Sequence, residues 1–245
     1  MARKLTSAEK KQISDLVSAY AEASADIRRF LRLTVTQLLD AMEENRPLFG
    51  LIHSLKYRMK DPGHLREKLG RKIREGADSG QDFGASESDL AEWVTDLAGC
   101  RLLHLHTRQM EEIHPVLLQL IPDAQCEFVG DPFAYVWDNE SRTYFDKIGI
   151  KTKPNDRLYS SVHYVIRPNN KTNVTCEIQV RTLADEIWGE IDHRFNYPKP
   201  HKSVACREQI SALAKAGSSF GRLVDSIVAS DEEFGDLIRK LKRRR

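Results

Sequence analysis

The sequence contains no long hydrophobic run. No apolar stretch approaches the roughly 20 residues that a transmembrane helix needs, and the first residues, MARKLTSAEKKQ, have no apolar core of the kind found in signal peptides. Cysteine is also scarce, with four residues in 245 and no CxxC pair. These absences argue against a membrane partner, a disulfide framework and a zinc site, and they favour a cytoplasmic protein.

A strong charge of one sign is absent as well, since 38 Lys and Arg residues are balanced by 36 Asp and Glu residues. The basic residues are nevertheless gathered in three clusters, at 56–74, 147–157 and 239–245. Clusters of this kind suit ligands that carry phosphate groups. Solvated helix surfaces are the alternative interpretation, and for 239–245 alone neither interpretation is favoured.

Hydrophobic periodicity predicts helices towards both ends of the chain. Apolar residues recur at three- and four-residue spacing between 7 and 44, and Pro62 is typical of the first turn of a second helix. Two more helices are expected at 183–195 and 204–242. The segment 76–89, rich in Gly, Ser and Asp, is expected to be a mobile loop.

The middle of the chain alternates between helix and strand patterns. A helix is expected at 110–121, and strands are expected at 100–106, 161–167 and 174–181, with weaker strand candidates at 125–129 and 143–145. The two strands on either side of the turn-rich segment PNNK predict an antiparallel hairpin. The whole pattern predicts an α/β fold with a mixed β-sheet, flanked by N- and C-terminal helices.

One face of the expected hairpin is polar. Glu177, Gln179 and Arg181 alternate along its second strand, and side chains two residues apart on a strand share a face. On the first strand His163 occupies one face, and Tyr159 precedes it in line. If the two polar faces coincide, an aromatic ring, an imidazole and a carboxylate surround one surface of the sheet.

Two carboxylates are placed to do chemistry. Asp96 lies just before the strand expected at 100–106, and strand ends commonly carry functional side chains. Together with Glu177 it could hold a metal ion and accept a proton. Four upstream cations could grip a triphosphate, namely Arg58, Lys60, Lys68 and Arg71. Taken alone, cations at this spacing more often mark a solvated helix surface.

A pair of histidines offers a rival metal site. His104 and His106 share a face of the strand expected at 100–106. No third ligand is apparent in the sequence, so a polar strand end is the favoured interpretation.

An ordered set of motifs identifies a family. The set comprises RMK at 58–60, KLGR at 68–71, DLAGCR at 96–101, KTK at 151–153, YSSVH at 159–163 and EIQVRT at 177–182, followed by His193 and Tyr197. In order and spacing it resembles the synthetase domains of RelA/SpoT proteins, in particular the small stand-alone members. The resemblance implies a nucleotidyltransferase-like domain at 51–200, between an N-terminal helical region at 1–50 and a C-terminal helical region with a basic tail at 201–245.

The resemblance also implies roles for the residues of the ATP side. Arg58 and Arg101 match the arginines that enclose the adenine of ATP in this family. Lys60, Lys68 and Arg71 match residues that contact its phosphates. Such roles agree with phosphoryl transfer, which depends on positioning and charge neutralisation more than on a covalent intermediate.

The same resemblance assigns the metal and the acceptor. Asp96 matches the aspartate that binds Mg²⁺, and Glu177 matches the glutamate that helps to hold the metal and activates the acceptor hydroxyl. Tyr159 matches the tyrosine that stacks on the acceptor base, usually guanine, and His163 a residue that touches acceptor phosphate. The expected acceptor side comprises Lys151, Lys153, Tyr159, His163, Gln179 and Glu186.

Two positions depart from the family pattern. Leu158 stands where a glycine usually precedes the stacking tyrosine, and only glycine reaches positive φ without a penalty. The acceptor loop is therefore expected to take another shape. Glu186 stands nine residues after Glu177, where guanine-specific small members often have asparagine. A carboxylate can still accept hydrogen bonds from guanine N1 and N2.

The resemblance implies a Mg²⁺-dependent pyrophosphokinase of the stringent response, which moves pyrophosphate from ATP to the 3′-hydroxyl of GDP or GTP and makes a (p)ppGpp-type alarmone. One alternative is a toxin that pyrophosphorylates the 3′ end of tRNA. Another is a catalytically silent module that binds nucleotide or RNA. A homo-oligomer or an antitoxin protein is also left open as a partner.

Overall fold

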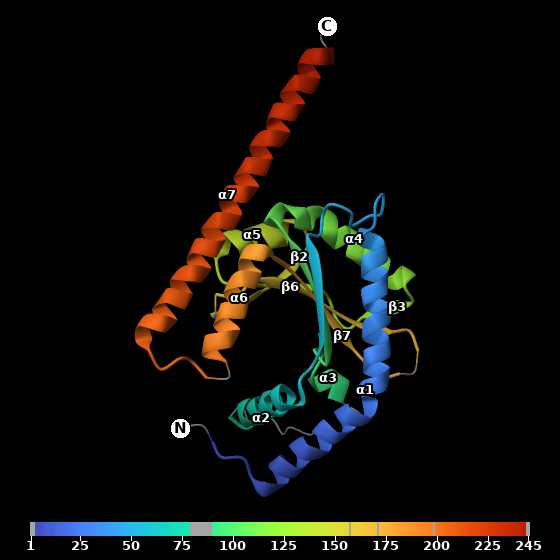
Figure 1. Cartoon of the computed structure of the whole chain (residues 1–245), viewed down its shortest axis with the longest axis vertical. Coiled ribbons are helices and arrows are strands. Elements are labelled where there is room, and N and C mark those ends of the chain that lie inside the picture. Colours follow the sequence, from blue (N-terminus) through green and yellow to red (C-terminus); the bar gives the residue numbers. More distant parts are fainter. Residues whose placement is uncertain (1–2, 79–89, 157, 171, 198, 244–245) are drawn as a thin grey trace.

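A computed structural model describes residues 3–78, 90–156, 158–170, 172–197 and 199–243 (Figure 1). Part of the expected loop, 79–89, lies outside the described residues, as do Arg157, Lys171, Arg244 and Arg245 from the basic clusters and the hairpin turn. None of the helices in the described ranges is both long enough and apolar enough to span a membrane.

The centre of the molecule is a seven-stranded mixed sheet of order β1-β2-β7-β6-β4-β5, in which β3 also pairs with β6. The strands are β1 (Ser54–Met59), β2 (Ala98–His104), β3 (Cys126–Phe128), β4 (Phe133–Val136), β5 (Lys151–Pro154), β6 (Ser161–Pro168) and β7 (Cys176–Thr182). β2 runs parallel to β7 and β4 parallel to β5, and the other pairs are antiparallel. The predicted mixed sheet and the predicted β6–β7 hairpin are confirmed.

Helices lie on both sides of this sheet. They are α1 (Ser7–Met42), α2 (Pro62–Asp78), α3 (Leu90–Trp93), α4 (Met110–Asp123), α5 (Asn139–Lys147), α6 (Leu183–Asn196) and α7 (Val204–Arg243), with a short 3-10 helix, η2 (Thr107–Gln109). Figure 1 shows α1 on one side of the sheet and α6 with α7 on the other. The predicted flanking helices are therefore confirmed.

The core lies between the sheet and α1. Cys100, Leu102, Ile178 and Val180 alternate along β2 and β7 and are all buried, together with the buried stripe of α1. Fully burying one side chain of the Leu, Ile or Val type contributes about 1.5–3 kcal/mol. The face of the sheet that packs against α1 therefore contributes most of the core. The residues that alternate with the buried ones point to the opposite face.

One strand prediction is wrong. Residues 143–145 lie within the helix α5. The helix begins there because the Asp138 side chain caps it, accepting a hydrogen bond from the backbone N–H of Ser141 at 2.8 Å. The strands β1, β4 and β5 were not predicted. β1 and β5 contain few apolar residues, and β4 has only four residues, too few to show a clear period.

Candidate active site

Polar and aromatic side chains form a row across the sheet. Residues opposite each other on neighbouring strands share a face, and the register places one such row across six strands. The row consists of Lys56, Arg101, Gln179, His163, Phe133 and Lys151. The row beside it passes through Arg58, Gly99 and Glu177.

A cavity of about 290 Å³ lies over these two rows. Its lining residues are Lys56, Tyr57, Arg58, Asp96, Gly99, Cys100, Arg101, Glu177, Gln179 and Glu190. Gly99 lies between Arg58 and Glu177 in the register, so the lack of a side chain keeps the floor of the cavity open. A Cβ at Gly99 would also lie 3.3 Å from the carbonyl oxygen of Glu177. The sheet thus brings together four residues that were predicted from distant segments: Arg58, Asp96, Arg101 and Glu177.

Asp96 is held by two lysines. Its carboxylate oxygens lie 2.5 Å from Lys60 Nζ and 2.7 Å from Lys68 Nζ. Burial alone would raise the pKa of Asp96, but the attraction of Lys68 and Lys60 outweighs burial and lowers the pKa to about 2. The Tyr20 hydroxyl donates a hydrogen bond to the carbonyl oxygen of Lys60 at 2.6 Å, so α1 helps to fix this end of β1. Asp96 is therefore ionised at neutral pH.

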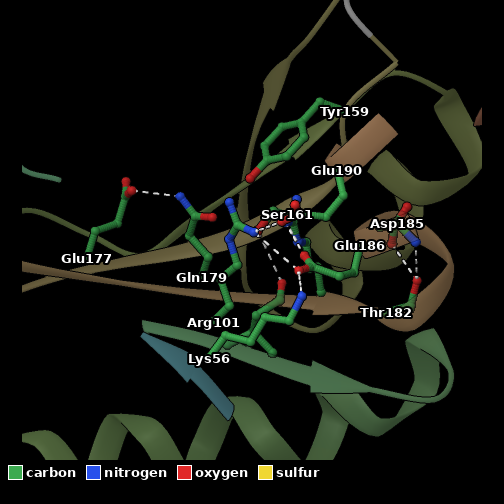
Figure 2. A network of polar contacts seen from close by, with 12 residues as sticks. Lys56, Arg101, Tyr159, Ser161, Glu177, Gln179, Thr182, Asp185, Glu186 and Glu190 are labelled. Atoms are coloured by element: carbon green, nitrogen blue, oxygen red, sulfur yellow. Dashed lines mark hydrogen bonds and ion pairs between the residues drawn. The ribbon is translucent and has the colours of Figure 1, made fainter. Parts of the chain in front are cut away.

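Glu177 is held on both of its oxygens. His163 Nδ1 lies 2.9 Å from Oε1, and Gln179 Nε2 donates to Oε2 at 2.8 Å (Figure 2 shows the second bond). Burial favours the protonated form of Glu177, but His163 outweighs it and the pKa lies below the ordinary value. Two residues predicted to bind acceptor, His163 and Gln179, thus contact Glu177 directly.

A hydrogen-bonded series runs from Tyr159 to this carboxylate. The Tyr159 hydroxyl lies 3.3 Å from His163 Nε2. Because a carboxylate only accepts hydrogen bonds, His163 Nδ1 carries a proton towards Glu177. In the neutral tautomer Nε2 then accepts from the Tyr159 hydroxyl. The series orients the imidazole and, through it, Glu177.

Two aromatic residues that the sequence pattern did not single out surround His163. Phe133 stacks on the imidazole, with ring centroids 5.4 Å apart and an angle of 9°, and Tyr135 meets it edge-on at 5.0 Å. Lys153 Nζ lies 3.3 Å from the centroid of the Phe133 ring, a cation–π geometry. The alternation in FAYV at 133–136 was the available signal, and with four residues it was too short to be decisive.

Glu186, which is predicted to bind the acceptor, lies among three cations. Its carboxylate contacts Lys56 at 2.8 Å and Arg101 at 3.2 Å (Figure 2). It also contacts Arg181. Glu186 and Arg181 are 5% and 4% exposed. On the solvent side of Arg101 a second carboxylate, Glu190, also contacts the guanidinium. Lys56 and Glu190 had not been singled out in the sequence.

Leu158 adopts the backbone conformation that glycine favours. Its φ is +58°, in the left-handed region, which costs a non-glycine residue about 1–2 kcal/mol. Its side chain packs with Tyr159 against a small buried cluster that includes Trp188 and Ile210. The leucine therefore keeps a backbone shape that glycine would adopt without strain, and it adds apolar contact to the cluster against which Tyr159 also packs.

The last motif residues form an aromatic group of their own. The rings of His193 and Tyr197 stack with centroids 4.7 Å apart, and His64 of α2 meets both edge-on. Burial and the nearby charge of Arg58 lower the pKa of His193. This group therefore ties the end of α6 to α2 beside the Arg58 end of the cavity.

Some predicted residues lie outside the cavity. Arg71 pairs with Glu75 on the same helix at 3.7 Å, and Lys151 pairs with Asp131. The two histidines proposed as a rival metal site have separate partners. His104 Nδ1 donates to the carbonyl oxygen of His106 at 3.0 Å, and His106 Nδ1 lies 3.3 Å from Asp225. No group of three or more His, Cys, Asp or Glu side chains suited to a metal occurs in the described part of the chain.

The fold and the cavity define an α/β protein whose open sheet face carries two carboxylates among several cations. The model of the region found in RelA / SpoT proteins matches residues 57–202, and the chain belongs to this family. A curated relative, the GTP pyrophosphokinase YwaC of Bacillus subtilis (strain 168), is 32% identical over 111 residues. That match covers 40% of this chain and 49% of the relative, so the chain spans about half the length of the curated relative it matches.

Solved structures share the fold. The small alarmone synthetase 1 of Bacillus subtilis superimposes with a TM-score of 0.55 at 17% identity, covering 89% of this chain and 96% of the other. A GTP pyrophosphokinase family protein from Streptococcus pneumoniae gives a TM-score of 0.58 at 17% identity, with 95% and 98% covered. At this identity the likeness extends to the fold alone.

Proposed function

We propose that this chain is a pyrophosphokinase that transfers the β,γ-pyrophosphate of ATP to the 3′-hydroxyl of a guanine nucleotide. The observation that carries the proposal is the convergence of Asp96, Glu177, Arg58 and Arg101 on one cavity. Membership of the RelA/SpoT family and the match to a GTP pyrophosphokinase support the same chemistry. A solved small alarmone synthetase of similar fold was crystallised with its product pppGpp, which supports guanine as the acceptor base.

The two carboxylates fit a magnesium ion. Mg²⁺ is usually held by one or two carboxylates together with substrate phosphates and water. Asp96 and Glu177 line the same cavity, and the pKa of each is lowered, so both offer ionised oxygens at neutral pH. A bound ion would offset the negative charge of the phosphates. Lys60 and Lys68, which contact Asp96, place further positive charge beside the same site.

In the proposed reaction Glu177 accepts the proton of the acceptor 3′-hydroxyl. The hydroxyl oxygen forms a bond to the β-phosphorus of ATP, and the bond from that phosphorus to the α,β-bridging oxygen breaks, so AMP leaves. His163 and Gln179 hold Glu177 in place for the proton transfer. Most of the remaining catalytic effect comes from positioning the two substrates.

The two substrates are proposed to occupy opposite ends of the polar row. Arg58 and Arg101 would enclose the adenine, with Lys60, Lys68 and Arg71 directed towards the phosphates. On the other side Tyr159 would stack on the acceptor base, and Lys151 and Lys153 at the edge strand β5 would meet its phosphates. Glu186, engaged by three cations, is assigned to holding Arg101 rather than to binding acceptor.

Labelled ATP tests the proposal. The chain is incubated with γ-labelled ATP, Mg²⁺ and, separately, GDP, GTP, ADP or bulk tRNA, and the labelled products are resolved. We expect label on the guanine nucleotides and a matching amount of AMP. Labelled tRNA without any labelled free nucleotide would replace this proposal with the tRNA-modifying alternative. No transfer to any acceptor would favour a binding module.

The ATP side yields a separate prediction. Arg58→Ala is expected to weaken ATP binding about 2- to 30-fold, since a cation–π contact contributes about 0.5–2 kcal/mol. The measurement is calorimetric titration with a non-hydrolysable ATP analogue, and acceptor affinity should change less. Arg66→Ala is the matched control, because Arg66 is exposed on α2 and does not line the cavity. If both variants bind the ATP analogue with equal affinity, Arg58 does not contact the adenine and is only a solvated surface residue.

A further inference from the structure

One edge of α2 faces the candidate active site. The buried stripe of this helix consists of Leu65, Leu69 and Ile73. The residues that directly precede the members of this stripe lie together on one side of it, and they are His64, Lys68 and Lys72. They are four residues apart, so they form a row along the helix with about 6 Å between successive members.

The first two members of the row touch the site. His64 meets the rings of His193 and Tyr197 edge-on, at the end of the cavity proposed for adenine. One turn further along α2, Lys68 Nζ lies 2.7 Å from a carboxylate oxygen of Asp96. The row therefore runs from the proposed adenine position to the proposed phosphate position, and its third member lies one turn beyond Lys68.

Lys72 is a half-buried cation without an ion-pair partner. Among the residues that the structure describes it forms neither an ion pair nor a hydrogen bond, whereas its neighbour Arg71 pairs with Glu75. Burial lowers the pKa of Lys72, and the charge of Lys68 lowers that pKa further. Like charges four residues apart on a helix are unfavourable. The protein therefore holds this ammonium group at a cost to its own stability.

The cations near Asp96 outnumber the carboxylates that they contact. Lys60 and Lys68 each contact one of its two oxygens, and Lys72 adds a third ammonium group on the same side of α2. Partly buried charges of one sign are costly unless an opposite charge compensates them. A polyphosphate chain supplies such compensation, because its oxygens accept charge-assisted hydrogen bonds from lysine.

We propose that Lys72 binds the terminal phosphate of the donor nucleotide and thereby selects a triphosphate over a diphosphate. This inference rests on the proposed function, in which Lys60, Lys68 and Arg71 are directed towards the phosphates of ATP. With the adenine at the Arg58 end and the inner phosphates beside Lys68, the γ-phosphate lies one helical turn further along α2, where Lys72 donates to it. The pyrophosphate that moves is then held by its outer phosphate while AMP leaves.

Calorimetric titration of the full chain with a non-hydrolysable ATP analogue and, separately, with ADP tests the inference. Lys72→Met is expected to weaken binding of the ATP analogue about tenfold or more, the usual effect of losing a hydrogen bond between charged groups, and binding of ADP less than about threefold. Lys72→Arg keeps the charge and should keep most of this discrimination. Arg66→Met is the matched control, because Arg66 is exposed on the other side of the buried stripe of α2.

Thermal unfolding of the same variants separates binding from folding. Lys72→Met removes an unfavourable charge, so its unfolding midpoint should equal or exceed that of the unchanged chain, and a lower midpoint would overturn the inference by giving Lys72 a structural role. Equal losses of affinity for the ATP analogue and ADP, or no loss for either, would overturn the inference and leave the proposed function standing. An unchanged chain that does not bind the ATP analogue would overturn both.

Discussion

Asp96→Asn and Glu177→Gln are each expected to lower pyrophosphate transfer by about 100-fold or more, the usual effect of losing a metal ligand or a proton acceptor. Both changes keep the size of the side chain, so they remove charge with little loss of packing. The measurement is the initial rate of labelled product at saturating ATP and acceptor. Transfer at the rate of the unchanged protein in either variant would disprove the two-carboxylate site.

The two variants should differ in their side effects. Asp96→Asn leaves Lys60 and Lys68 without their counter-charge, and the Lys60 side chain is only 10% exposed. We therefore expect a lower midpoint of thermal unfolding for Asp96→Asn than for Glu177→Gln. Glu190→Gln serves as the control, because it makes the same chemical change on the same cavity at a side chain that is 54% exposed. It should lower transfer less than tenfold.

The parts of the fold that could be predicted are those with a strong period. The buried stripe of α1 and the alternation in β6 and β7 extend over many residues, so their signals were clear. β1 was missed because its six residues, SLKYRM, contain three polar positions that line or border the cavity. Residues 143–145 were predicted to be a strand from their local β propensity, but the cap at Asp138 starts a helix that includes them.

The site was predictable as a set of residues but not as a set of contacts. The ordered motifs predicted Asp96, Glu177 and the cations as site residues, and the structure places four of them, Arg58, Asp96, Arg101 and Glu177, at one cavity. Pair contacts such as Lys60 with Asp96 join segments 36 residues apart, and no local pattern encodes such partners. The same holds for Glu186, whose three cationic partners come from β1, β2 and β7. These contacts of Glu186 are therefore visible only in the structure.

Glu186→Ala is expected to destabilise the protein by about 3–5 kcal/mol, because removing one member of a buried ion pair leaves the other charge without compensation. The charge in question is Arg181, which is 4% exposed. The free energy of unfolding is measured by denaturant titration. Glu190→Ala is the control, since Glu190 contacts Arg101 from the solvent side and should cost less than about 1 kcal/mol. Similar losses for both variants would contradict the buried-pair argument.

A double variant separates stability from function at the same position. Glu186→Leu with Arg181→Met removes both charges, and replacing a buried pair with apolar residues is often neutral or stabilising. We expect this variant to regain most of the stability lost in Glu186→Ala. Its Arg101 and Lys56 still lack the carboxylate that holds them, so KM for ATP should rise while KM for the acceptor changes little. A residue that only holds Arg101 acts through the ATP side of the cavity and should leave KM for the acceptor unchanged. A selective rise in KM for the acceptor would therefore show that Glu186 binds the acceptor base.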